Sequence, residues 1–161
     1  MQLDDIKNQL IWTDNWTLNL IEEIKEDQMM LIPEGIGTNI NWQMGHIIIS
    51  KYFHAFAIVW GMEKPFNCEI PLDQYKEIYG YGSKAVESSF NQRKANIVDH
   101  FNKVSEAVIE SLKLIDDDML MKPTTLPHPV LKTNLDALTF VFKHQMYHCG
   151  QMALIKRILN S

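Results

Sequence analysis

Glycine and proline are gathered into three clusters, and this placement constrains the fold more than any other feature of the sequence. All six prolines and five of the seven glycines lie within 33–37, 61–82 and 123–129. Because proline interrupts helices and glycine weakens them, the clusters divide the chain into four long segments. In each segment, apolar residues recur at alternating spacings of three and four, which is the period of one helical face. The sequence therefore predicts an all-α fold.

The apolar period predicts where the four helices lie. Asn39 or Asn41 can cap the second helix, and Gly61 stands where a C-terminal glycine is expected. Thr133 and Asp136 form a start to the fourth helix that resembles a capping box, with Asp in place of Glu. The expected helices are 3–26, 41–60, 90–116 and 134–159.

Four amphipathic helices without strand-like alternation predict a four-helix bundle, here a single domain over 1–161. Two connections, 62–89 and 119–132, are longer than simple turns, and the first is expected to contain a short helix at 72–78. Because long connections in a compact bundle often lie over a functional site, both are candidates to cover one.

Charge and cysteine content narrow the class of protein. Fifteen Lys and Arg against twenty Asp and Glu give a net charge of −5, which argues against a nucleic-acid partner. The chain starts without the pattern of a signal peptide, and no apolar window is long enough to span a membrane, so no membrane partner is expected. Cys68 and Cys149 are too few for a disulfide framework. We interpret both as structural and expect a cytoplasmic protein.

Three of the six histidines, His46, His144 and His148, occupy positions that the helical period assigns to the core. His144 and His148 are one turn apart on the same helical face. An unpaired buried polar group costs about 1–3 kcal/mol, so three core imidazoles need partners. A divalent metal satisfies all three and leaves open coordination positions, as in catalytic sites. The alternative is that each is an ordinary core histidine bonded to a neighbour.

Other metal architectures of helical proteins do not fit the sequence. It contains neither the Glu-x-x-His pairs of di-iron bundles nor the H-E-x-x-H pattern of zinc proteases. Cys149 directly follows His148, which turns it about 100° away from the histidine face. Three imidazoles with open positions suit zinc, nickel, copper or iron, so the spacing leaves the metal open.

Two stretches carry a resemblance to a known family. They are 41–47, with the sequence NWQMGHI, and 144–151, with the sequence HQMYHCGQ. Together they resemble the DinB/YfiT-like superfamily, whose members have one metal histidine early in the second helix and an H-x₃-H pair in the last long helix. The resemblance extends over essentially all 161 residues.

The resemblance implies an up-down-down-up bundle, usually a homodimer, with His46, His144 and His148 as ligands of a divalent metal. The metal of relatives is nickel, zinc or iron-like. Characterised relatives include transferases that use bacillithiol or mycothiol and a maleylpyruvate isomerase.

The leading functional hypothesis is a metal-dependent thiol S-transferase. The metal would lower the pKa of a low-molecular-weight thiol that then attacks a small electrophilic substrate. A metal-dependent hydrolase and a non-catalytic metal- or ligand-binding dimer are the alternatives. No clear Asp or Glu shares the histidine faces to serve as a base. Lys51 and Lys143 are candidates, by adjacency alone, to bind an anionic thiol, and Gln151 to hold a ligand or substrate.

The remaining polar and aromatic residues have ordinary interpretations beside functional ones. Thr13 and Thr17 either line a cavity or bond back to their own helix. His54 is expected at the rim of the site, and His100 and His128 in solvent. The tryptophans are expected in the core or on a dimer surface, the mid-chain tyrosines in a lid or a packed loop, and 116–118 at a solvated helix end. These aromatic residues are Trp12, Trp16, Trp42, Trp60, Tyr75, Tyr79 and Tyr81.

Overall fold

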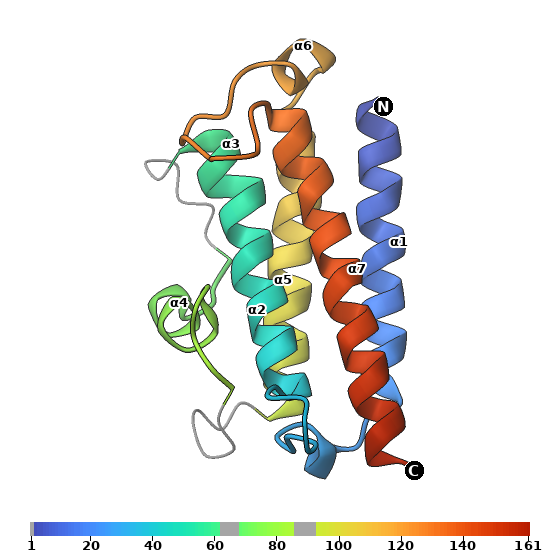
Figure 1. Cartoon of the computed structure of the whole chain (residues 1–161). Coiled ribbons are helices and arrows are strands. Elements are labelled where there is room, and N and C mark those ends of the chain that lie inside the picture. The colour runs from blue at the N-terminus through green and yellow to red at the C-terminus, as the bar shows by residue number, and fades with distance from the viewer. Residues whose placement is uncertain (1, 62–67, 86–92) are drawn as a thin grey trace.

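The computed structural model describes residues 2–61, 68–85 and 93–161, and its long elements are all helices (Figure 1). Each of the four long helices packs against two others: α1 and α2 both contact α5 and α7. No β-strand occurs in these ranges, so the all-α prediction is confirmed. The four are α1 (Leu3–Glu22), α2 (Ile40–Tyr52), α5 (Lys94–Leu112) and α7 (Asn134–Leu159).

The predicted helix 41–60 has three parts. After α2 come one π-helical turn, η2 (Phe53–Ala57), and the short α3 (Ile58–Trp60). Asn39 caps α2, because its side chain accepts a hydrogen bond from the Trp42 amide at 2.8 Å, and Gly61 follows α3 with φ 82°. Phe53, which continues the apolar spacing of this segment, is 41% exposed. The π turn changes the helical period at this point, which a uniform spacing cannot anticipate.

The first and third helices end earlier than predicted. After α1 the chain turns into a 3₁₀ helix, η1 (Glu26–Gln28), and places Ile24 in the core. After α5, Asp116 caps a separate helix, α6 (Asp117–Leu120), by accepting the Met119 amide at 2.7 Å. Residues 116–118 are exposed at a helix end, as predicted, but this end is the start of α6 and not the end of the third predicted helix. Residues 90–92 of the predicted helix lie outside the described ranges.

The short helix predicted at 72–78 is confirmed as α4 (Leu72–Tyr79), which packs on α2. Gly45 makes this contact possible: a Cβ at position 45 would overlap the Tyr79 ring. Because the helices approach so closely, the Tyr79 backbone reaches the side chains of α2.

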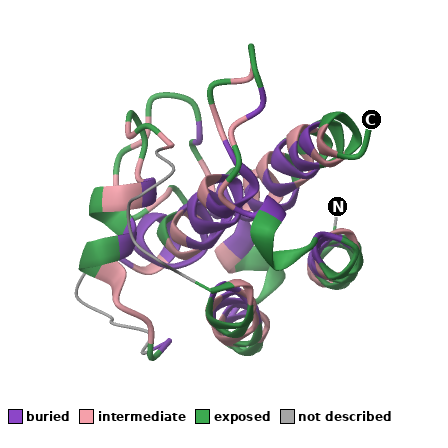
Figure 2. Ribbon diagram, turned by 90° about the horizontal axis from the view of Figure 1, so that it is seen from below, coloured by how far each residue is buried: buried purple, intermediate pink, exposed green. Residues whose placement is uncertain are grey.

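Buried residues lie toward the interior of the bundle, and exposed residues lie on its outside (Figure 2). The exception to simple amphipathicity is α2, which packs against α4, α5 and α7 and is buried on most of its surface. On α7, Thr133 and Asp136 form the expected capping box. No helix within the described ranges combines the length and apolarity needed to cross a bilayer.

Candidate metal centre

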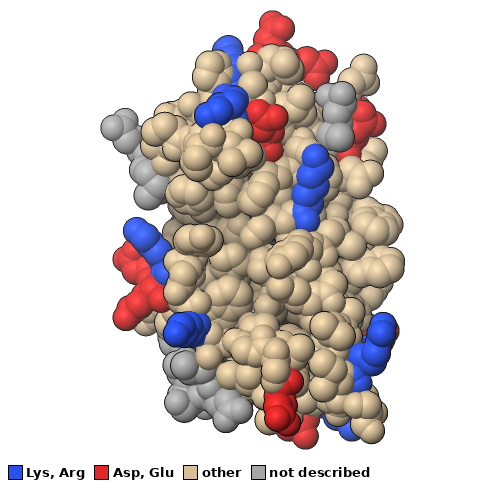
Figure 3. Space-filling view, in the orientation of Figure 1, with Lys and Arg blue, Asp and Glu red and all other residues tan. Residues whose placement is uncertain are grey.

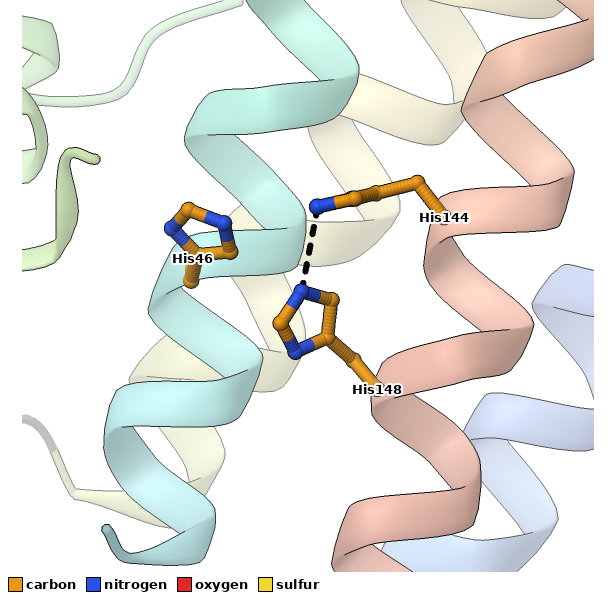
Figure 4. Close-up of side chains that lie close together, drawn as sticks. All are labelled: His46, His144 and His148. Carbon is orange, nitrogen blue, oxygen red and sulfur yellow. Dashed lines mark hydrogen bonds between the residues drawn. The ribbon is translucent and has the colours of Figure 1, made fainter. Parts of the chain in front are cut away.

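The three histidines singled out in the sequence converge between α2 and α7 (Figure 4). One ring nitrogen from each lies within 4.8 Å of the corresponding atoms of the other two, and Nε2 of His148 is 3.1 Å from Nε2 of His144. His46 and His148 are 9% and 5% exposed, whereas His144 is half-buried. The cluster is therefore enclosed by the bundle but accessible at His144. Such a group can hold a metal ion.

Two of the rings have their tautomer fixed by groups that only accept hydrogen bonds. Nδ1 of His46 lies 2.7 Å from the Tyr79 carbonyl oxygen, and Nδ1 of His148 lies close to Oε1 of Gln43. The Gln43 amide orientation is consistent with this, because its nitrogen donates to Thr38 at 3.1 Å. Each Nδ1 must carry the proton, which leaves a lone pair on Nε2. That is the state in which a histidine binds a metal.

The third ring, His144, is held through a serine. Its Nδ1 lies 3.1 Å from Oγ of Ser50, and the same hydroxyl lies 3.1 Å from Nδ1 of His54. Because the hydroxyl can accept from His144, this ring can adopt the same tautomer as the other two. Three Nε2 lone pairs in one enclosed space form a donor set that fits a divalent cation.

Burial keeps the three imidazoles neutral. Desolvation lowers the pKa of His144 to about 3 and that of His148 to about 4, and neighbouring histidines contribute in the same direction. Desolvation also lowers the pKa of His46, against the opposing effect of its bond to the Tyr79 carbonyl. Neutral imidazoles are the form that binds metals, so at neutral pH the ligands need not first release protons.

Aromatic rings surround the cluster. Trp42 stacks on His46 with ring centroids 4.8 Å apart, and its indole nitrogen donates to Ser83 at 3.0 Å. Phe140 stacks on His144, with ring centroids 5.1 Å apart. These contacts restrict the rotation of two of the three imidazoles, so the rings are held in place without a metal.

The groups that orient the histidines were not predicted from the sequence, although the spacing of two of them along the helix could have indicated their role. Gln43 and Ser50 are at i−3 and i+4 from His46, which places all three on one face of α2. The Tyr79 carbonyl had no such signal, because a backbone acceptor from another helix leaves no trace in the pattern.

His54 lies at the rim of the cluster, as predicted, whereas His100 differs from its predicted surroundings. His54 is half-buried beside His144, with ring centroids 6.3 Å apart, and its Nδ1 donates to the Ser50 carbonyl. His100 is half-buried and bonds the Tyr75 hydroxyl at 2.8 Å, so its assignment to solvent is wrong. His128, also expected in solvent, is half-buried as well, and it accepts hydrogen bonds from the amides of Val130 and Leu131.

The structure also decides between the alternatives for the tryptophans and the mid-chain tyrosines. Trp12 and Trp16 are 51% and 50% exposed, so the core alternative is wrong for both. Tyr75 and Tyr79 are buried in the packed α4, while Tyr81 is fully exposed. Trp60 is half-buried and packs against the core.

A second polar cluster lies deeper in the bundle, and we call it the buried polar layer: Asp14, Thr17, Lys51, Ser105 and Gln145. Lys51 is 2% exposed and pairs with Asp14, and its amine also donates to Ser105 at 2.8 Å. Gln145 donates to Asp14 and Thr17 at 2.9 and 2.7 Å. The layer thus joins α1, α2, α5 and α7. Because Lys51 is committed here, it cannot bind a thiol, and that prediction is wrong.

The small polar residues of α1 and the cysteine of α7 find their hydrogen-bond partners in or next to this layer. Thr13 and Thr17 each donate to the carbonyl one turn earlier, as the ordinary interpretation predicts. Cys149 is buried, lies 3.2 Å from the Thr17 hydroxyl and faces away from the histidines. Gln151 donates to the Tyr147 hydroxyl at 3.1 Å and opposes the fall in the His148 pKa. Its role with a ligand stays a prediction.

We expect Gln43→Ala to weaken metal binding by about 10- to 100-fold, the usual cost of losing a group that orients a metal-bound histidine. Gln28→Ala is a matched control, since Gln28 is also a buried glutamine but bonds Asn160, far from the histidines. A competition titration with a chromogenic chelator measures both affinities. Equal affinities would show that Gln43 does not orient His148.

We expect the metal-free protein to lose stability as the pH falls from about 6.5 toward 4. Unfolded histidines take up protons near 6.5, whereas His144 and His148 stay neutral down to about 3 and 4. The unfolded state then binds more protons, so the free energy of unfolding decreases with falling pH. Urea denaturation across this range measures the slope, which His144→Phe should reduce. A flat profile would contradict the burial of neutral imidazoles.

Comparison with known proteins agrees with this geometry. A family model described as the DinB superfamily matches residues 9–152, a range that includes all three histidines. No curated protein matches the chain.

Proposed function

The chain belongs to the DinB superfamily, and from this membership and its three converging histidines we propose that it is a metal-dependent enzyme that transfers a thiol to a small electrophile. His46, His144 and His148 are the proposed ligands of a divalent ion such as nickel, zinc or iron.

One observation supports the metal more than any other. His46 and His148 both have Nδ1 bonded to an acceptor, which leaves their Nε2 lone pairs in the same enclosed space as Nε2 of His144. Lone pairs that face one another are unfavourable unless a cation or a proton lies between them. Because burial lowers the pKa of all three imidazoles, a proton is disfavoured and a metal ion is the better partner.

The surroundings of the histidines favour thiol transfer over hydrolysis. A bound metal would act as a Lewis acid that lowers the pKa of a coordinated thiol. Within the described residues, the potential metal-binding group contains three imidazoles and no carboxylate that could serve as a general base for water. Trp42 and Phe140 cover two sides of the group and limit access of water, and the half-buried His144 leaves a route for a small substrate.

We further propose the up-down-down-up topology of the superfamily, in one domain over 1–161. The direction of the long helices supports it, since α1 and α7 run one way and α2 and α5 the other (Figure 1). The cytoplasmic location suggested by the cysteine content stays a prediction, and the free thiols of Cys68 and Cys149 fit it.

We also propose a homodimer formed through α1 and α7, which pack against each other. Trp12 and Trp16 are exposed with ring centroids 5.3 Å apart, and Tyr147 and Leu154 on α7 are 64% and 46% exposed. Few charged side chains lie over the middle of the face that includes α7 (Figure 3). Sedimentation of Trp16→Glu tests this proposal: we expect a monomer, and an unchanged dimer would place the interface elsewhere.

The proposed activity is tested with metal-loaded protein, a panel of low-molecular-weight thiols and 1-chloro-2,4-dinitrobenzene as a generic electrophile. We expect at least one thiol to be conjugated faster than with metal-free protein, and His148→Ala to behave as the metal-free form. Turnover no higher than in the metal-free protein for every thiol would favour a non-catalytic binding protein.

A further inference from the structure

A groove lies one aromatic ring away from the histidines. Its volume is about 350 Å³, at the small end of the range for ligand sites. The first half of α7 and the segment before it form its walls. The lining residues are Val130, Leu131, Leu135, Asp136, Thr139, Phe140 and Lys143.

Phe140 connects the groove to the candidate metal centre. The residues Phe140, His144 and His148 follow one another at intervals of four, so they form one stripe along α7. The Phe140 ring lines the groove and also stacks on His144 at 5.1 Å. A molecule that packs in the groove against Phe140 is therefore separated from His144 by this one ring.

The walls of the groove are mostly apolar, and part of this surface is exposed. Val130 is 74% exposed, although it is an aliphatic residue, and Leu135 and Phe140 are half-buried. Apolar walls with a few polar groups are typical of sites for small organic molecules. The apolar part of a ligand would remove these side chains from water.

The two charged residues of the groove are not equivalent. Asp136 belongs to the cap of α7, since its carboxylate accepts the amides of Lys132 and Thr133 at 3.1 and 3.0 Å. Lys143 is exposed and takes part in none of the ion pairs found among the described residues. Hydrogen bonds from Thr133 and Lys132 are the main causes that lower the pKa of Asp136, and the charge of Lys143 adds to them. Lys143 is therefore the charge at the groove that remains available to a ligand, and it favours an anion.

We infer that this groove binds the substrate of the histidine centre, and that the substrate is a small organic anion with an apolar, preferably aromatic, body. The inference rests on the proposed function for the identity of the centre. Phe140 and the aliphatic walls contact the body of the substrate, and Lys143 contacts its anionic group. Thr139 also lines the groove, so a larger side chain at this position would reduce the space for the body.

The test measures the affinity of benzoate and of its neutral analogue benzamide by ligand-observed NMR. Lys143→Gln should lower the affinity for benzoate by about two- to fivefold, the effect of one exposed ion pair, and should leave the affinity for benzamide unchanged. Thr139→Trp should prevent the binding of both benzoate and benzamide, because the larger side chain fills the groove. Lys76→Gln is the matched control, because Lys76 is an exposed lysine on α4, outside the groove lining.

Measurements on His148→Ala separate this inference from the proposed function. Groove binding needs no metal, so benzoate should bind this variant as it binds the wild type, whether or not the wild type holds a metal ion. Loss of benzoate binding in His148→Ala, together with full binding in Thr139→Trp, would show that the carboxylate binds the metal directly. That result, or equal affinities of benzoate in the wild type and Lys143→Gln, would overturn the inference.

Discussion

Replacing His148 by alanine should lower the affinity for a divalent metal by at least about 100-fold. Loss of a residue that merely orients a ligand already costs 10- to 100-fold, and the loss of one of three ligands should cost more. His148 is central to the cluster, because its Nε2 lies 3.1 Å from that of His144 and its Nδ1 bonds Gln43. Metal content after dialysis, measured by mass spectrometry, gives the result.

His100→Ala is the matched control for this experiment. His100 is half-buried, whereas His148 is buried, and His100 bonds Tyr75 and takes no part in the cluster. We expect this variant to keep the metal content of the wild type. If His148→Ala retained full metal content with an unchanged circular dichroism spectrum, the proposed ligand set would be wrong.

Replacing Asp14 by alanine should destabilise the protein by about 3–5 kcal/mol, because it leaves a buried cation without its counter-ion. The amine of Lys51 would retain Ser105 at 2.8 Å and the face of the Phe101 ring at 4.5 Å, which do not replace a carboxylate. Burial lowers the pKa of Lys51, and Asp14 opposes that fall. Without Asp14 the lysine should release its proton more readily, so the loss of stability should be smaller at high pH.

Urea denaturation of three variants tests this prediction. Asp99→Ala removes the exposed ion-pair partner of Lys103 on α5. It should lower the free energy of unfolding by at most about 0.5 kcal/mol. The double variant Asp14→Leu, Lys51→Met should recover much of the stability, since buried ion pairs can often be replaced by apolar residues. Equal losses in Asp14→Ala and Asp99→Ala would show that the buried polar layer does not contribute to stability as described.

The helices and the three candidate ligands could be predicted from the sequence because both depend on a local period. Apolar spacing located the long helices, and the same spacing placed His46, His144 and His148 on core faces. The Asn39 cap and the Thr133 capping box were recognisable for the same reason, since each involves residues within one turn.

What the sequence did not reveal depends on contacts between distant segments. The Tyr79 carbonyl reaches His46 because Gly45 lets α4 approach α2. Lys51 is buried because Asp14, 37 positions earlier, meets it in the core. A charged side chain would otherwise be assigned to the surface, since burying an unpaired charge is costly.

His54 lies where a uniform period places it. A period of 3.6 residues puts it about 80° from His46, at the rim of the site, and His54 is half-buried beside His144. The π-helical turn over Phe53–Ala57 was not predicted, because neither glycine nor proline marks its position.

The central claim is that one divalent ion binds to three imidazoles between α2 and α7. X-ray absorption spectroscopy of the wild-type protein loaded with one equivalent of zinc tests it most directly. We predict three imidazole nitrogens at about 2.0–2.1 Å, with no sulfur in the coordination shell. A spectrum with fewer than three imidazoles, or with sulfur at about 2.3 Å, would contradict the site built from His46, His144 and His148.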